Sequence, residues 1–236
     1  MSGHSKWSQI KHQKGAADAR RGNLFSKLAN NISLAARSGA DPATNFALRL
    51  AIERAKAANM PKANIERAIA RGSGSGGEKQ LEAFHYEAYG PGGIAILIDI
   101  ATENRNRAGS EVKSVLNKFG GRLASPGSVN YLFEQVGLIK VKTGSAKDDA
   151  ELAIIDSGAK DYDQIDAGYL VYTEPRAVDL VRQKLAEGGF EIEEAHLSFE
   201  PKTTTTVKEG ESERAIKLLE ALEELDDVVG VYSNLG

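Results

Sequence analysis

Residues 94–98 read Ile94-Ala95-Ile96-Leu97-Ile98, which is the longest wholly apolar run in the chain of 236 residues. The run lacks the alternation of a strand with one solvent face, so it predicts a central strand that other elements cover. It is far too short to cross a bilayer. We therefore expect it to lie in the middle of a sheet.

The segments around this run supply partners for that sheet. A Gly90-Pro91-Gly92-Gly93 turn precedes it, and a helix that carries Ala108, Val112 and Leu116 on one face follows it. The predicted elements of this domain are strands at 84–89 and 94–102, a helix ending near 119, strands near 129–133 and 138–141, a helix at 211–225 and a strand at 228–232.

The residues before the sheet predict three short helices. Leu24, Phe25, Leu28 and Ile32 recur at spacings of three and four, which indicates a helix over 23–38. Asp41-Pro42 predicts the start of the second helix, which runs to about residue 59, and Met60-Pro61 separates it from a third that ends near residue 71. The glycines and serines of residues 72–77 predict a flexible linker. Residues 1–20 carry no clear period, so we expect an extended or irregular arm.

A second α/β unit is expected within the acidic part of the chain. It combines a helix over 146–157, a strand at 169–172, a helix after Pro175 and a strand at 190–199. The sequence as a whole predicts an α+β fold in which one α/β sandwich is inserted into another. The predicted domains are a basic helical domain with its linker at 1–77, a central α/β domain at 78–142 and 203–236, and an inserted acidic α/β domain at 143–202.

Charge is divided unevenly along the chain. Residues 1–72 hold thirteen Lys and Arg against four Asp and Glu, whereas residues 73–236 hold 17 basic and 29 acidic side chains. A basic segment of this kind predicts a nucleic-acid partner or an acidic membrane surface. Of the two we favour nucleic acid, because cationic side chains gain affinity for phosphates by releasing the counterions of the nucleic acid.

The arm is the first candidate site. Its basic residues surround Trp7, the only tryptophan, whose ring would offer a stacking face to an unpaired base. The alternative is that the basic residues form a solvated surface and that Trp7 merely fixes the terminus to its own bundle. The candidate nucleic-acid-binding residues are His4, Lys6, Trp7, Lys11, His12, Lys14, Arg20, Arg21 and Lys27.

A second polar cluster lies where the buried strand meets the following helix. Thr102, Asn104, Arg105 and Arg107 stand at a helix N-terminus, where free N–H groups suit an anion or an acidic partner. The alternative is ordinary helix capping by Thr102 or Asn104, with the arginines in surface pairs. Both interpretations stand at this point.

The sequence gives no positive sign of an enzyme. Cysteine is absent, and the four histidines lack partners at the spacing of a zinc site. No nucleophile-elbow pattern surrounds any serine. We therefore expect no catalytic residues, no metal and no cofactor, in a cytoplasmic protein that does not enter membranes.

Several blocks of residues are spread along the whole chain: Gly3–Trp7 with Ile10–His12, Asn59–Lys62 with Asn64–Ile69, Tyr89–Gly93, Thr102–Arg107, Gly127–Val129, and Leu225–Val228 with Val231–Asn234. Together these blocks resemble the YebC family over the full length. In residues 146–200 the likeness is mainly one of pattern, Arg122–Pro126 replaces a more polar loop of the family, and Ala63 stands where an acidic residue is common in it.

The resemblance implies a helical bundle followed by two α/β domains, the last inserted in the middle one. Bacterial members are described as DNA-binding transcriptional regulators and are also linked to the ribosome. Mitochondrial relatives are described as translational activators. Three functions remain open: an RNA-binding translation factor on ribosomal RNA, with ribosomal proteins as further partners; a DNA-binding transcription regulator; and a protein-interaction module. The sequence favours RNA, because it shows no helix-turn-helix pattern with a recognition helix.

Overall fold

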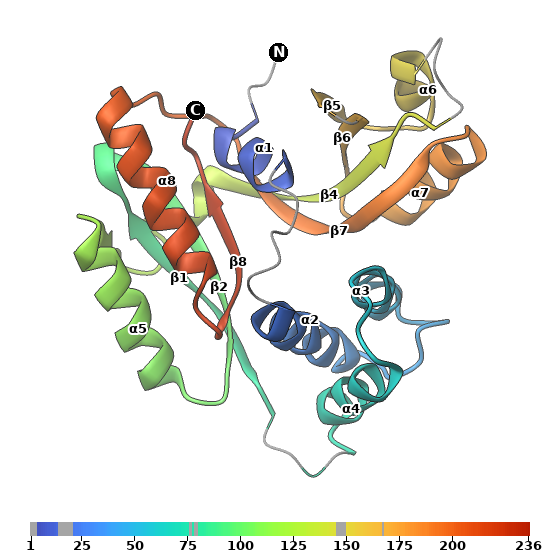
Figure 1. The fold of residues 1–236 in the computed structure, drawn as a ribbon, viewed down its shortest axis with the longest axis horizontal. Helices are drawn as coiled ribbons and strands as arrows, with labels where there is room; N and C mark the ends of the chain where they lie inside the picture. Colours follow the sequence, from blue (N-terminus) through green and yellow to red (C-terminus); the bar gives the residue numbers. More distant parts are fainter. Residues whose placement is uncertain (1–3, 14–20, 76, 78–79, 145–149, 167) are drawn as a thin grey trace. The chain divides into compact units, whose positions relative to one another are not determined.

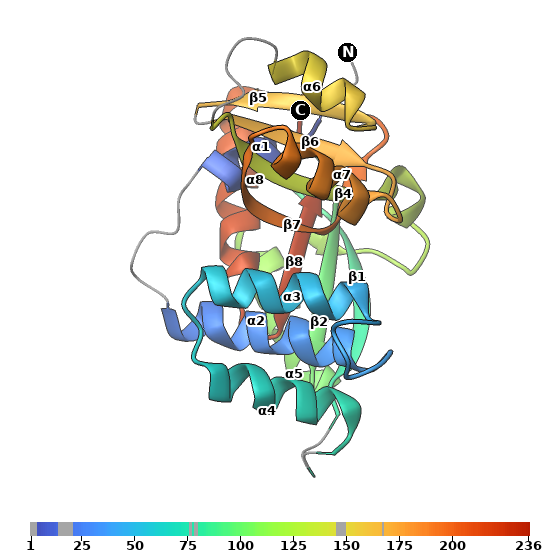
Figure 2. The same ribbon diagram turned by 90° about the vertical axis from the view of Figure 1, so that its right-hand side faces the viewer.

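A computed structural model of the chain describes residues 4–13, 21–75, 77, 80–144, 150–166 and 168–236 (Figures 1 and 2). Helices and two four-stranded sheets make up these residues, which confirms the α+β class. The chain divides into two compact units, one formed by Met1–Phe133 with Glu200–Gly236 and the other by Glu134–Phe199. No helix within the described ranges combines the length and apolar composition needed to cross a membrane.

The basic helical part of the first unit is built from α2 (Arg21–Ala36), α3 (Phe46–Ala57) and α4 (Lys62–Ser73). Figure 2 shows α2 between the other two helices. Leu28, Ile32 and Ile65 belong to its buried core, as their helical spacing predicts, and Leu48 from α3 joins them.

The start of α3 differs from the prediction. Asp41 accepts a hydrogen bond from the Ala43 N–H at 2.9 Å and forms a turn rather than a helix cap. The side chain of Asn45 is the cap, because it accepts a hydrogen bond from the Leu48 N–H at 3.1 Å. Its amide also donates to the carbonyl of Gly39 at 2.7 Å, which fixes the loop to the helix.

The predicted linker also begins later than expected, because α4 continues to Ser73 and Gly74 ends it in the left-handed conformation. Gly72 therefore lies within the helix. A Cβ atom at this position would come within 2.1 Å of the Ser33 carbonyl oxygen, so glycine is required for the close approach of α2 and α4.

The first sheet has the strand order β3-β1-β2-β8. Most of the apolar run lies in its interior strand β2. Ile96, Ile98 and Ile100 from that strand pack under helices α5 (Arg105–Lys118) and α8 (Glu209–Glu223). Figure 1 shows both helices on one face of the sheet. The elements are β1 (Glu82–Tyr89), β2 (Ala95–Thr102), α5 (Arg105–Lys118), β3 (Arg122–Leu123), α8 (Glu209–Glu223) and β8 (Val228–Ser233).

The expected irregular arm is partly helical. Residues Lys6–Gln13 form α1, and its Lys6 N–H donates a hydrogen bond to the Leu235 carbonyl at 2.9 Å. The arm prediction is therefore wrong for these residues. Packing against the C-terminal end of the chain, rather than a periodic apolar stripe, accounts for this helix.

The second sheet has the order β5-β6-β4-β7, and α6 and α7 cover one face of it (Figure 2). The strand predicted at 138–141 belongs to this sheet rather than the first, since it pairs with β6, so the inserted unit begins near Glu134 and not at 143. Strand β5 was not predicted. The elements are β4 (Phe133–Lys142), α6 (Ala150–Asp156), β5 (Asp161–Ile165), β6 (Gly168–Thr173), α7 (Val178–Glu187) and β7 (Glu191–Pro201).

Candidate nucleic-acid interface

Four of the nine candidate nucleic-acid-binding residues are described with their side chains: His4, Lys6, Trp7 and Lys27. Lys11 and His12 lie in α1 and Arg21 begins α2, but their side chains fall outside the described part of the structure. Lys14 and Arg20 lie outside the described residues altogether.

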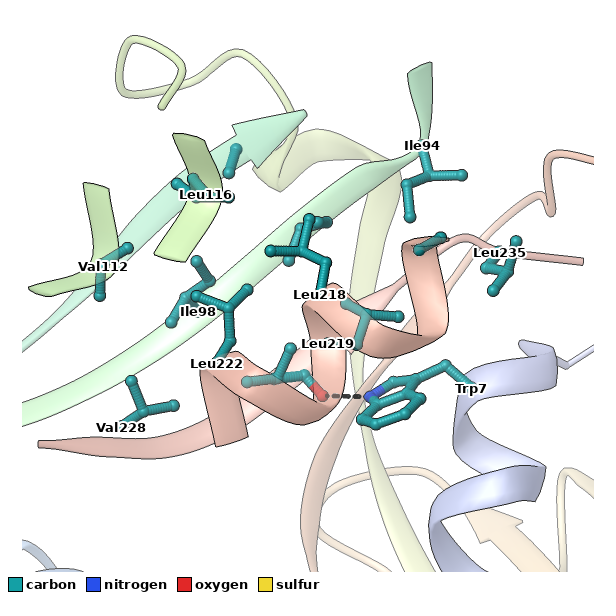
Figure 3. Packing of buried hydrophobic residues seen from close by; sticks show 14 of the residues in the cluster. Trp7, Ile94, Ile98, Val112, Leu116, Leu218, Leu219, Leu222, Val228 and Leu235 are labelled. Atoms are coloured by element: carbon teal, nitrogen blue, oxygen red, sulfur yellow. Dashed lines mark hydrogen bonds between the residues drawn. The ribbon is translucent and has the colours of Figure 1, made fainter. Parts of the chain in front are cut away.

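Trp7 is buried and cannot offer its ring to a base. Only 3% of the residue is exposed, and its indole N–H donates a hydrogen bond to the Val231 carbonyl at 3.1 Å. Figure 3 shows the ring against α8, near Leu219 and Leu235. Stacking by Trp7 is therefore corrected to a packing role, close to the alternative considered above, except that Trp7 fixes the arm to the central domain and not to the helical bundle.

Lys27 is also engaged within the protein. Its ammonium group donates to the carbonyl of Val228 at 2.7 Å and to that of Glu223. A buried or half-buried ammonium needs such acceptors to offset the loss of water. Contact with phosphate would break these bonds, so the structure corrects the prediction for Lys27 to a structural role.

His4 and Lys6 have different surroundings. The His4 side chain is 11% exposed, and its Nδ1 lies 3.9 Å from a carboxylate oxygen of the buried Glu200. Lys6, in contrast, is exposed at the start of α1. Of the described arm residues, Lys6 alone is therefore a solvent-facing cation.

The described part of the helical domain carries further cations on its surface. Between residues 24 and 75 there are eight Lys and Arg against three Asp and Glu. Some of these cations have partners within the protein. The guanidinium of Arg71 pairs with Glu103. The guanidinium of Arg49 lies 5.6 Å from the centre of the Phe46 ring and donates a hydrogen bond to the Pro42 carbonyl. The exposed cations are Arg37, Lys56, Lys62 and Arg67.

The cluster at the start of α5 has the contacts of a capped helix. The hydroxyl of the buried Thr102 accepts a hydrogen bond from the Asn104 N–H at 3.0 Å, and the Asn104 side chain accepts one from the Arg107 N–H at 3.1 Å. The guanidinium of Arg107 donates to Asp227 at 2.8 Å, and that of Arg105 lies 4.2 Å from the centre of the Phe84 ring. These contacts correspond to the capping interpretation, and the anion or partner site at these residues stays a prediction.

A buried carboxylate organises the loop that follows β3, and no local sequence pattern indicated this role. Glu87 accepts hydrogen bonds from the N–H groups of Gly127 and Val129 at 2.6 Å and of Asn130 at 2.9 Å. Burial alone would raise the pKa of Glu87, but these three donors hold it below the usual value. Glu87 is therefore a charged structural residue.

His85 and Asp99 form a cross-strand pair between β1 and β2. Their side chains are 2.6 Å apart, and this hydrogen bond raises the pKa of His85 although burial opposes it. The Tyr232 hydroxyl donates to the same carboxylate at 3.4 Å, and burial raises the pKa of Tyr232. Within the described ranges no group of three or more His, Cys, Asp or Glu side chains is placed to hold a metal ion.

Comparisons with known proteins cover both parts of the chain. A family model described as the TACO1/YebC protein N-terminal domain matches residues 5–75, and one described as the TACO1/YebC second and third domain matches residues 81–235. A probable transcriptional regulatory protein of Thermomicrobium roseum is 48% identical over 237 residues, which are 99% of this chain and 96% of that protein. A probable transcriptional regulatory protein of Chloroflexus aggregans is 49% identical over 240 residues, which are 100% of this chain and 95% of that protein.

A solved structure is similar over nearly the whole chain. The crystal structure of a conserved hypothetical protein from Aquifex aeolicus superposes with a TM-score of 0.90 at 44% sequence identity. The match covers 98% of this chain and 97% of that one.

Proposed function

Because the chain belongs to the TACO1/YebC family, we propose that it is a non-enzymatic regulator of gene expression that binds nucleic acid through its basic helical domain. More specifically, the regulator that we propose is an RNA-binding translation factor that docks on ribosomal RNA. Lys6, Lys11, Lys14, Arg20 and Arg21 are the proposed phosphate contacts of the arm. Trp7 and Lys27 are not among them, since both are engaged inside the protein.

One observation carries the proposal: basic side chains are concentrated in one domain of a chain whose remainder is acidic. The described helical domain has eight basic side chains against three acidic ones, and four of the basic ones, Arg37, Lys56, Lys62 and Arg67, are exposed. Phosphates along a nucleic acid would pair with such scattered cations whatever the base sequence. The acidic remainder confines this attraction to the helical domain and the arm.

Two features support RNA over duplex DNA. The exposed cations lie on α3, on α4 and just beyond the end of α2 rather than along one helix that could enter a major groove. The remaining residues, with 29 acidic against 17 basic side chains, would repel a long duplex lying across the molecule. RNA loops and junctions present phosphates in compact arrangements, which suits a single small basic domain.

A DNA-binding transcription regulator is the second candidate. The observation in its favour is that the relatives compared above are named probable transcriptional regulatory proteins. The phosphate contacts proposed here would serve either partner, so the difference must be measured directly.

Equilibrium binding of the full chain to a folded ribosomal RNA fragment and to a DNA duplex of equal phosphate number, over a range of salt concentrations, tests the proposal. The triple variant Lys6→Ala, Lys11→Ala and Lys14→Ala should weaken RNA binding and lower the salt slope by about two to three, since each phosphate contact adds about 0.7–0.9. The matched control replaces three exposed lysines of the acidic remainder, Lys113, Lys184 and Lys217, with alanine.

The control variant should bind as the wild type does. Equal affinity of the arm triple variant and the wild type would remove the arm from the interface. Tighter binding to DNA than to the RNA fragment at every salt concentration would favour the transcription regulator.

A further inference from the structure

A groove of about 190 Å³ lies between α2 and α4 in the basic helical domain. Pockets that enclose a whole small molecule usually measure about 300–1,000 Å³, so this groove suits one group of a larger ligand rather than a free cofactor. Its lining residues are Phe25, Ser26, Ala29 and Ser33 from α2 and Asn64, Arg67, Ala68 and Arg71 from α4.

Small side chains create the groove. The Ser33 hydroxyl donates a hydrogen bond to the Ala68 carbonyl at 2.9 Å, and Gly72 lets the two helices approach closely. Beside this contact, Ala29 and Ala68 are too short to fill the space between the helices. The hollow therefore follows from the short side chains that α2 and α4 present to each other beside this contact.

The lining combines an apolar floor with polar groups. Phe25, Ala29 and Ala68 are apolar, whereas Asn64 offers an amide donor and an amide acceptor. Arg67 is exposed, and none of the acidic side chains that the structure describes pairs with it. Its neighbour Arg71 differs, because it pairs with Glu103, so Arg67 provides the net positive charge of the groove.

We propose that this groove binds one unpaired nucleotide of an RNA chain, with its phosphate at Arg67, its base against Phe25 and the base edge at Asn64. The inference rests on the RNA-binding function proposed above and assigns a specific site to it. An arginine is suited to phosphate, and an aromatic ring with an amide is suited to a splayed base.

The concave shape selects an unpaired nucleotide. Proteins read duplex DNA by inserting a helix or strand into a groove of the nucleic acid, which requires a protruding element. A hollow in the protein instead receives a group that projects from its partner, as an unstacked base of an RNA loop does. The excess of basic side chains around the groove favours a nucleic acid over an apolar peptide.

The test measures binding of the full chain to a labelled single-stranded oligouridylate of twelve nucleotides and to a fully paired RNA duplex of the same length. Ala29→Leu fills the groove without changing charge, and Arg67→Gln removes its cation. The matched control is Arg214→Gln, which removes an exposed arginine of α8, outside the groove and in the acidic remainder of the chain.

Ala29→Leu and Arg67→Gln should each weaken binding to the oligouridylate by about tenfold, the effect of losing one charge-assisted or packed contact. Arg214→Gln should change it by less than about threefold, and Ala29→Leu should leave duplex binding unchanged. Thermal unfolding checks that each variant is folded. Should Ala29→Leu fail to fold, Asn64→Asp introduces a repelling charge at the partly exposed rim, with Ser38→Asp as its control outside the groove.

Each alternative outcome is distinct. If the wild type binds the oligouridylate and all the groove variants do so equally well, the groove is not the site and the proposed function still stands. If the wild type binds no RNA at all, both fail. An equal loss of duplex and single-strand binding in Ala29→Leu would contradict an unpaired nucleotide, and equally strong competition by a hexaglutamate peptide would indicate an acidic protein segment instead.

Discussion

At the scale of single residues, the structure separates cations that are available from cations that are already engaged. Lys27 and Lys6 look alike in the sequence, but Lys27 donates to two backbone carbonyls whereas Lys6 is exposed. Local sequence could count these charges but could not show which of them have partners, because the partners of Lys27 lie about two hundred residues away. The same holds for Glu87, whose three N–H donors come from a loop forty residues later.

Glu87→Gln should destabilise the protein at neutral pH by about 1–3 kcal/mol, because the loop from Gly127 to Asn130 loses its charged acceptor. The pKa of Glu87 lies below its ordinary value in the folded protein. Its contribution is therefore complete above the pKa of the unfolded chain and is lost as pH falls through the folded pKa.

Chemical denaturation of the wild type and Glu87→Gln at several pH values checks this expectation. The difference in unfolding free energy should be largest near pH 7 and should shrink below about pH 4. Glu82→Gln, an exposed position on the same strand, is the control and should have little effect. A difference for Glu87→Gln that is the same at pH 3 and pH 7 would contradict the charged role.

At the scale of elements, periodic segments could be predicted and segments fixed by distant contacts could not. The three helices of the basic domain follow from their apolar stripes. Helix α1 has no such stripe, and Trp7 anchors it through a bond to Val231, which is 224 residues away. Strand β5 is largely polar, and its pairing with β6 and the hydrogen bond from Tyr172 to Asp163 at 3.0 Å support it.

Strand pairing likewise explains the misplaced domain boundary. The sequence predicts a strand near residue 140 but does not say which sheet it joins. Strand β4 pairs with β6, and helix α6 and strand β5 lie between these two strands in the sequence. The candidate site was predictable to the same extent: the basic domain could be identified, whereas the groove between α2 and α4 depends on the tertiary contact at Gly72.

Trp7→Ala should destabilise the protein by about 3–5 kcal/mol, the usual cost of removing a buried tryptophan. Trp7→Phe should cost less, because it keeps most of the packing and loses the hydrogen bond to Val231. Denaturant unfolding measures the free energy of unfolding of both variants. Lys6→Ala, a substitution at an exposed position, is the control and should leave this free energy unchanged.

Trp7 is the only tryptophan in the chain, so its fluorescence gives an independent check of its packing role. Emission of a buried indole should remain unchanged when RNA is added at saturating concentration. Strong quenching by RNA would show that the ring stacks on a base and would contradict the packing role.

At the scale of the whole molecule, the division of charge is the feature that links fold to function. The inserted unit and the rest of the central domain contribute most of the acidic side chains, and the helical domain and the arm contribute the basic excess. Attraction to phosphates should therefore arise from one part of the chain and decrease steeply with salt. The near-neutral total charge conceals this property.

Ultraviolet crosslinking in cells identifies the nucleic acid that the protein binds, when the bound nucleic acid is sequenced, the crosslinked peptides are identified and the same lysate is sedimented. We expect crosslinks concentrated in ribosomal RNA, peptides from the arm and helical domain within residues 1–75, and co-migration with ribosomes. Crosslinks at promoter DNA without a ribosomal peak, or peptides confined to the inserted unit, would contradict the account.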